Sequence, residues 1–356
     1  MLVVNCRFLS QKITGTQKFA IEICKELNAE YKDIMFIAPP NIIQKEIANK
    51  LNVKIVGSRF YKVVSFLRLP ANLLWEQLFL PYYLKKLDNN VPLLNLVNVA
   101  PIFYNYNYIV LHDIAFKRFP HFFNKYFLLL YNILVPRILK KAQKIFTVSY
   151  FSKSEIEKYF PYSKGKIEVI YNAIDDNLQK NNCDTHKEPY VLTVGSLEPR
   201  KNISKLINAM SINNNIKLVI VGDKNSKVFD NVYDNLNLNI ENVVFTGYIE
   251  NEELQELYEN ATAFIYPSIY EGFGIPPLEA QNYGIPVIIS DIEVFREIYG
   301  ESVYYVNPHE SEHIYNGIEK VFNNKKLQLE LIKNGYDNIK RYSWKNSAKK
   351  MMACLK

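Results

Sequence analysis

The sequence predicts an α/β protein made of two doubly wound, Rossmann-like domains. Its 356 residues exceed what one hydrophobic core usually supports, so two domains are expected. Short apolar, β-branched runs alternate with helical patterns along the chain, which is typical of parallel sheets flanked by helices. A polar stretch at 175–189 interrupts this alternation and is the expected linker.

Each half of the chain contains six predicted strands, with helical patterns such as 18–27 and 73–87 between them. The predicted strands are 2–4, 35–38, 53–56, 93–97, 109–111 and 145–148, then 191–194, 218–221, 243–245, 263–266, 287–289 and 303–306. We therefore assign residues 1–178 and 188–342 to the two domains and 343–356 to a final helix that returns to the first. Open parallel sheets bind ligands at the carboxyl ends of their strands, so a cleft between two facing domains is the expected site.

Composition limits the class of protein. Hydrophobic residues make up 48% and charged residues 22%, the balance of a soluble globular chain. No signal peptide is evident, and the most apolar stretch, 126–136, is too short to cross a bilayer, so a cytoplasmic location is expected. The four cysteines form no C-x-x-C pair. A net charge of +7 fits a solvated surface, and no pattern for nucleic-acid binding is present.

The most informative segment follows the predicted strand 263–266. Glu271, Gly272, Phe273, Gly274 and Ile275 form a glycine-containing loop, and the prolines that follow mark the first turn of a helix. Glycines and a helix start let backbone amides approach an oxygen-rich ligand. Glu279 lies one turn inside that helix, so both glutamates are candidates for binding vicinal hydroxyls. Two glutamates alone would more simply be a loop residue and a helix-start charge.

A second signal follows the predicted strand 191–194. The pattern G-x-L-x-P-R-K-N runs from Gly195 through Arg200 and Lys201 into a helix that extends to Met210. Two adjacent cations at a strand-to-helix turn are suited to a diphosphate, because they add to the helix-start amides. A solvated basic turn would be the alternative without the glycine and the proline.

With these residues in view, the chain resembles family 4 of the GT-B glycosyltransferases over nearly its whole length. Glu271 and Glu279 form an E-x7-E motif like that of the family, and the turn at Gly195 is similar to its G-x-L-E-P-R-K-N motif. Gly15 lies in a segment that resembles the amino-terminal glycine loop, and His112 matches the first-domain histidine. Further similarities lie at 147–152, 169–175 and 286–291.

The resemblance implies a retaining transferase that moves a sugar from a nucleotide-sugar to a glycan or lipid-linked acceptor. It implies that Arg200 and Lys201 bind the diphosphate and that Glu279 binds the ribose. Glu271, with Gly272, Phe273, Gly274 and Ile275, would bind the donor sugar. Gly15 would approach the phosphates from the other domain, and His112 would face the ligand. Mannosyltransferase-like members that build O-antigen or capsule are the nearest in pattern, so GDP-mannose is the expected donor.

Several features set the limits of the resemblance. Thr16 and Gln17 stand where many relatives have other residues, and Tyr171 and Ala173 replace a proline and a glycine. The chain has no Asp-x-Asp motif, so no metal or other cofactor is expected and the cations must stabilise the leaving diphosphate. A non-catalytic nucleotide-sugar-binding subunit and a GT-B sugar-nucleotide epimerase remain as alternatives.

A basic and aromatic stretch at 117–127 suggests a further partner. It includes Lys117, Arg118 and Lys125 among four phenylalanines and a tyrosine. Rings at an interface and cations near anionic lipid would together give peripheral binding to the inner membrane. The alternative is a helix entry packed on the core, because aromatic residues at helical spacing are usually buried.

Overall fold

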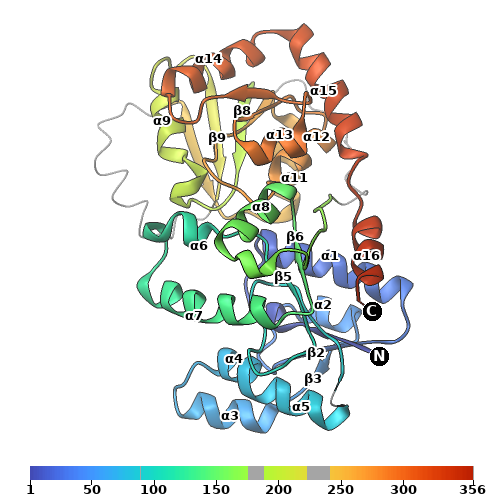
Figure 1. Cartoon of the computed structure of the whole chain (residues 1–356). Coiled ribbons are helices and arrows are strands. Elements are labelled where there is room, and N and C mark those ends of the chain that lie inside the picture. The colour runs from blue at the N-terminus through green and yellow to red at the C-terminus, as the bar shows by residue number, and fades with distance from the viewer. Residues whose placement is uncertain (89, 175–187, 223–240, 356) are drawn as a thin grey trace. The chain divides into compact units, whose positions relative to one another are not determined.

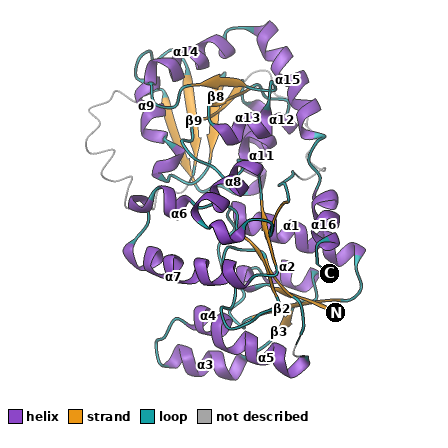
Figure 2. Cartoon of the chain, in the orientation of Figure 1, coloured by secondary structure: helices purple, strands orange, loops and turns teal. Residues whose placement is uncertain are grey.

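The computed structural model describes residues 1–88, 90–174, 188–222 and 241–355 (Figure 1). The chain divides into two compact units, one formed by Met1–Asn172 with Ser343–Lys356 and the other by Ala173–Tyr342. Each unit contains one sheet with helices packed against it (Figure 2). The chain is therefore an α/β protein with two parallel-sheet units. Most of the predicted linker, residues 175–187, lies outside the described residues.

Unit 1 contains a seven-stranded sheet with the order β3-β2-β1-β4-β5-β6-β7, in which all neighbouring strands are parallel. The strands are β1 (Leu2–Asn5), β2 (Ile34–Ala38), β3 (Lys54–Ile55), β4 (Leu93–Asn95), β5 (Asn107–Val110), β6 (Lys144–Thr147) and β7 (Ile167–Val169). The helices are α1 (Gly15–Glu30), α2 (Lys45–Lys50), α3 (Ser58–Phe66), α4 (Ala71–Leu74), α5 (Leu80–Leu87), α6 (Ala115–Arg118), α7 (Lys125–Lys141), α8 (Tyr150–Tyr159) and α16 (Trp344–Ala353).

Unit 2 contains a six-stranded parallel sheet with the order β10-β9-β8-β11-β12-β13. Its strands are β8 (Tyr190–Val194), β9 (Lys217–Val221), β10 (Val243–Gly247), β11 (Ala263–Tyr266), β12 (Val287–Ser290) and β13 (Tyr304–Val306). Its helices are α9 (Ile203–Met210), α11 (Asn251–Asn260), α12 (Ile275–Asn282), α13 (Glu293–Tyr299), α14 (Ser311–Phe322) and α15 (Lys325–Ile339).

Strand order reverses once in each sheet. In unit 1, β1, β2 and β3 proceed to one side and β4 to β7 proceed to the other, so the reversal lies between β1 and β4. In unit 2 the reversal lies between β8 and β11. Loops leave the carboxyl ends of two adjacent strands in opposite directions at such a point, and ligands of open α/β sheets bind there. The topology therefore marks one position in each unit.

All twelve strands predicted from the sequence correspond to strands of the structure, but β7 was missed. It has only three residues, and the half-buried Glu168 interrupts its apolar pattern. Glu168 forms an ion pair of 2.8 Å with Lys350 of α16. The helix α16 packs on α1, where Phe19 and Trp344 make an edge contact with ring centroids 5.7 Å apart. The predicted final helix thus belongs to unit 1.

Candidate functional site

The loop after β8 presents two cations at the reversal point of unit 2. Gly195 lies so close to Gly222 that a Cβ on Gly222 would be 2.2 Å from the Gly195 carbonyl oxygen. Arg200 and Lys201 lie on a short 3-10 turn, Pro199–Lys201, and not on the first turn of one long helix as the sequence suggested. Asn202 ends that turn in the left-handed region, with φ of 60°, so α9 begins separately at Ile203.

Asn202 also ties this turn to its neighbours. Its side-chain amide donates to the carbonyl oxygens of Pro267 at 3.2 Å and Pro308 at 2.7 Å. The backbone N–H of Ile269, in the loop after β11, donates to the Arg200 carbonyl at 2.9 Å. The loops after β8 and β11 are therefore held together. Asn202, the single left-handed residue between the 3-10 turn and α9, sets the position of Arg200 and Lys201.

The loop after β11 leads directly into α12. Gly274 precedes that helix with φ of 91°, and a Cβ there would be 2.8 Å from the Phe295 ring. Only glycine suits both the backbone angle and the space. The Tyr299 hydroxyl donates to the Gly274 carbonyl and fixes the loop. Glu271 lies before this glycine, and Ile275 is the first helical residue. The sequence prediction of a strand, a glycine loop and a helix is confirmed.

The two loops bring three charged side chains together. The ammonium Nζ of Lys201 is 2.5 Å from Oε1 of Glu271, and Arg200 Nη1 is 2.8 Å from Oε2 of the same carboxylate. Lys201 also donates to the Tyr266 hydroxyl. Arg200 is paired a second time, with Glu198 at 2.7 Å. These side chains are at most 18% exposed, except that of Glu198, which is 46% exposed. The two ion pairs made by Glu271 are therefore largely shielded from water.

Electrostatics keep this cluster charged. Burial alone raises the pKa of Glu271, but the adjacent Lys201 and Arg200 outweigh it and bring that pKa to about 2. Burial lowers the pKa of Lys201, and Glu271 opposes this effect. Little water reaches Lys201 and Arg200, so their positive charges are stabilised mainly by the Glu271 carboxylate, which also holds them in place. A pocket lined by Gly195, Ser196, Lys201 and Tyr266, among others, opens beside them.

Glu279 is hydrogen-bonded to a tyrosine of α11. It is half-buried on α12, and its Oε2 accepts a hydrogen bond of 3.1 Å from the Tyr258 hydroxyl. Tyr258 stacks on Tyr283 at a centroid distance of 5.0 Å. The E-x7-E pair is thus divided, with one carboxylate held by cations and the other by a phenol.

Gly15 is the first residue of α1 in unit 1, and a Cβ built on it would meet nothing within 4 Å. The preceding Thr14 caps the helix, and the side chain of Gln17 accepts from the Thr14 backbone N–H at 3.2 Å. Gln17, one of the departures from the family pattern, therefore closes a capping box. The open space at Gly15 leaves the helix start accessible.

His112 lies two residues after the carboxyl end of β5 and is buried. Its Nε2 is 3.0 Å from the Leu96 carbonyl, and its ring makes an edge contact with Phe19 at 4.9 Å. Burial lowers the pKa of His112 from 6.5 to about 4, only partly opposed by the bond to Leu96. The imidazole is therefore neutral near pH 7, with Nε2–H donating and Nδ1 left as an acceptor.

This shift predicts a pH-dependent stability. Because the folded-state pKa lies below the unfolded value, stability present above pH 6.5 is lost as the pH falls toward 4, by about 3 kcal/mol at most. We expect His112→Gln to reduce the loss of free energy of unfolding between pH 7 and pH 4.5, measured by urea denaturation. His121→Gln, at an exposed histidine, is the control. An unchanged pH dependence in His112→Gln would contradict the assignment.

The structure thus brings Arg200, Lys201 and Glu271 into one cluster, with Lys201 and Gly195 in the pocket lining and Glu279 on the helix that follows. Gly15 and His112 belong to the other unit. Tyr266, the last residue of β11, was missed by the sequence analysis, although its place at a strand end before a glycine loop was a usable signal. Within the described residues, no group of His, Cys, Asp and Glu side chains is placed to hold a metal ion.

Comparison with known proteins gives a consistent result. Residues 13–178 match the model "Glycosyltransferase Family 4", and residues 175–338 match "Glycosyl transferases group 1". The chain is 29% identical over 342 residues to the O-antigen chain mannosyltransferase RfbU of Salmonella typhimurium, covering 90% of each chain. It is also 29% identical over 258 residues to O-antigen chain mannosyltransferase B of Escherichia coli, covering 66% of each.

Solved structures share the fold at low sequence identity. The Anabaena protein HepE, determined with UDP and glucose, superposes with a TM-score of 0.75 at 17% identity, covering 99% of this chain and 98% of the other. Sucrose-phosphate synthase from Thermosynechococcus elongatus superposes with a TM-score of 0.74 at 17% identity, with the same coverage. This likeness, together with the two parallel sheets, confirms the predicted fold class, an α/β protein of the GT-B type.

Proposed function

Because the chain belongs to family 4 of the glycosyltransferases, we propose that it is a retaining hexosyltransferase that builds a bacterial surface polysaccharide such as O-antigen. The proposed donor is GDP-mannose and the proposed acceptor a glycan or lipid-linked oligosaccharide. Support for the sugar comes from the mannosyltransferases among the relatives. The observation that carries the proposal is the Arg200-Lys201-Glu271 cluster at the reversal point of unit 2, in which Lys201 and Glu271 are buried.

The cluster supports a mechanism of electrostatic stabilisation. When the glycosidic bond breaks, negative charge develops on the leaving nucleoside diphosphate. Arg200 and Lys201, already fixed by Glu271, would stabilise that charge without having to reorganise. Glu271 would orient the donor sugar, with the loop from Gly272 to Ile275, and Glu279 would bind the ribose hydroxyls. Departure and attack on one face of the sugar would retain the anomeric configuration.

The residues of unit 1 have proposed roles of a different kind. His112 is neutral near pH 7, so it would recognise a sugar hydroxyl by hydrogen bonding and would not supply positive charge. Gly15 would bind phosphate through the accessible start of α1. Neither residue is proposed to form a covalent intermediate.

Nucleotide release from a panel of nucleotide-sugars, with lipid-linked acceptor and excess EDTA, tests this function. We expect release from at least one donor, with unchanged rate in chelator, because the two cations neutralise the diphosphate. Incubation without acceptor is the control, since an epimerase would convert the nucleotide-sugar alone. Complete loss of turnover in EDTA with recovery on adding magnesium or manganese would contradict the metal-independent mechanism.

We further propose that unit 1 contacts an anionic membrane. No described helix is long and apolar enough to span one. The end of α3 and the segment after it expose large apolar side chains, with Phe66 86%, Leu67 58% and Leu69 48% exposed. Residues 47–75 contain five Lys or Arg and no Asp or Glu. Exposed apolar residues among cations are suited to the interface of an anionic bilayer.

The stretch at 117–127 is less suited than the segment after α3. Phe123 and Phe127 pack against the core of unit 1. Arg118 pairs with Glu155 at 3.2 Å, and the Lys117 ammonium lies 5.9 Å from the centre of the Phe160 ring. These contacts favour the role of core and rim for this stretch. The proposed membrane contact therefore lies on α3 and the loop that follows it.

Sedimentation with phosphatidylglycerol vesicles tests the membrane proposal. Each cation near anionic lipid contributes about 1 kcal/mol, so replacing Arg59, Lys62 and Arg68 with Ser should weaken binding about a hundredfold at low salt. Replacing Lys117, Arg118 and Lys125 with Ser is the matched control and should have a smaller effect. Absence of binding by the unmodified chain, or the reverse order of the two triple variants, would contradict the proposal.

A further inference from the structure

A second polar cluster lies in unit 1, and the proposed donor chemistry does not use it. It consists of Arg7, Glu76, Asn98, Asp113 and Tyr131, and we call it the Arg7 cluster. Arg7 comes two residues after β1, Asn98 three after β4, and Asp113 three after β5. Strand order reverses between β1 and β4. The cluster therefore occupies in unit 1 the position that the ion cluster occupies in unit 2.

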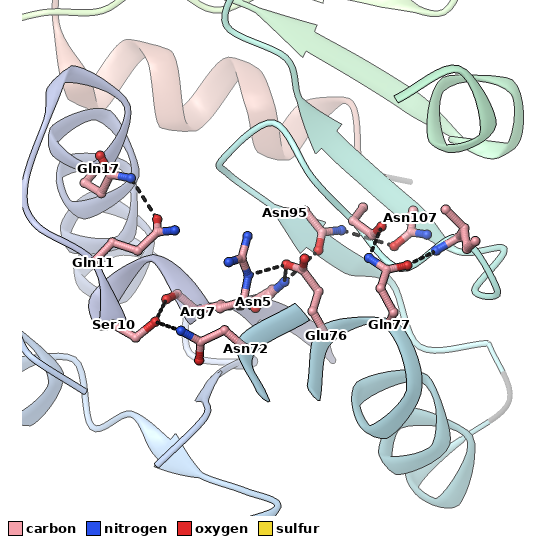
Figure 3. A network of polar contacts seen from close by, with 12 residues as sticks. Asn5, Arg7, Ser10, Gln11, Gln17, Asn72, Glu76, Gln77, Asn95 and Asn107 are labelled. Atoms are coloured by element: carbon pink, nitrogen blue, oxygen red, sulfur yellow. Dashed lines mark hydrogen bonds and ion pairs between the residues drawn. The ribbon is translucent and has the colours of Figure 1, made fainter. Parts of the chain in front are cut away.

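Arg7 is held by a buried network (Figure 3). Its Nε donates to Oε1 of Glu76 at 2.8 Å, and the side-chain amide of Asn5 donates to the same oxygen at 2.9 Å. Asn5 also donates to Asn95 at 3.0 Å. Glu76 is 1% exposed and lies on the π-helical turn Trp75–Phe79, a geometry that is frequent at functional sites. The network holds the Arg7 guanidinium through its Nε atom.

The guanidinium is only partly used by this network. Within the part of the chain that the structure describes, Glu76 is its one ion-pair partner, and it binds Nε. The terminal nitrogens point away from the network in Figure 3, and the side chain is 15% exposed. A fixed, planar pair of N–H donors at the carboxyl end of the parallel strands is suited to a ligand with two adjacent acceptor oxygens.

The rest of the cluster adds hydrogen-bonding groups of both kinds. Tyr131 is hydrogen-bonded to Asn98, and burial raises its pKa to about 12, with Arg7 acting against this and Glu76 and Asp113 adding to it. Tyr131 is therefore a neutral phenol. Asn98 has a left-handed φ of 46°, and its side-chain oxygen accepts from the His112 backbone N–H at 2.9 Å. This strained residue connects the cluster to His112.

We propose that the Arg7 cluster binds the terminal sugar of the acceptor, a neutral glycan; this rests on the proposed transferase function. One cation, two carboxylates, an amide and a phenol offer alternating donors and acceptors, which match the vicinal hydroxyls of a sugar. A diphosphate group or another polyanion would face the carboxylates of Glu76 and Asp113 as well as Arg7. Arg7 thus recognises the acceptor sugar, and Glu76 positions the Arg7 side chain.

Saturation-transfer NMR on the full chain tests this site, with the methyl glycosides of mannose, glucose, galactose and N-acetylglucosamine as probes and inorganic pyrophosphate as the anionic alternative. We expect at least one glycoside to bind. The signal should fall at least tenfold in Arg7→Gln and persist in Arg137→Gln, a control at an exposed arginine of α7. Calorimetry with GDP and UDP should give the same affinity in all three proteins.

The double variant Arg7→Gln/Glu76→Gln separates recognition from folding, because it leaves no unpaired buried charge. It should melt near the parent temperature and still bind no glycoside. Parent-level glycoside binding by this variant, binding of pyrophosphate in place of glycosides, or no glycoside binding by the parent chain would overturn the proposal. Failure of the parent chain to bind any nucleoside diphosphate would instead count against the transferase function alone.

Discussion

Lys201→Met is expected to lower turnover by about a hundredfold or more. Its ammonium is buried and lines the pocket, and loss of a single preorganised charge-stabilising group typically costs a factor of 10²–10³. Steady-state nucleotide release measures the effect. Lys217→Met removes a lysine of the same unit that forms an exposed pair with Glu188, and it should change turnover little.

A structural effect of Lys201→Met has to be separated from the catalytic one. The substitution leaves the Glu271 carboxylate buried beside Arg200 alone, which lowers stability. The double variant Lys201→Met/Glu271→Gln removes both charges and should melt closer to the parent chain while it stays inactive. Near-normal turnover of a folded Lys201→Met, or recovery of activity in the double variant, would remove the proposed role of Lys201.

Glu279→Ala is expected to weaken binding of the free nucleoside diphosphate by about ten- to a hundredfold, because a hydrogen bond to a charged group contributes about 1.5–3 kcal/mol. Glu271→Gln should leave that affinity unchanged or raise it, since Arg200 and Lys201 then lose a competing anion. Calorimetry distinguishes the two. Tyr258→Phe, which removes the hydroxyl bonded to Glu279 but leaves the carboxylate, should have a small effect. Equal losses in both glutamate variants would reject this division of roles.

The fold was predictable because every strand except β7 carries its own signal. Buried parallel strands are continuous apolar runs, and those of β1, β8 and β11 were recognisable without any knowledge of their neighbours. The three-residue β7 was not, because Glu168 hides its pattern and its partner Lys350 is far away in sequence. Strand order was also beyond prediction, because β8 neighbours both β9 and the much later β11.

The candidate site was predictable as residues but not as an arrangement. Lys201 and Glu271 were each singled out, yet their pairing across 70 positions depends on β8 and β11 being adjacent. The sequence also suggested that the cations start a helix, whereas left-handed Asn202 separates their turn from α9. Arg7 carried no signal at all, because a lone arginine after a strand acquires meaning only when Glu76 is packed against it.

A crystal structure with GDP or UDP bound in the presence of EDTA tests whether Arg200 and Lys201 bind the diphosphate. We expect phosphate oxygens to lie within hydrogen-bonding distance of the Arg200 and Lys201 side chains, with the ribose hydroxyls on Glu279 and with Glu271 left without a nucleotide contact. A nucleotide bound away from Lys201, or one that binds only when a divalent metal is supplied, would contradict it.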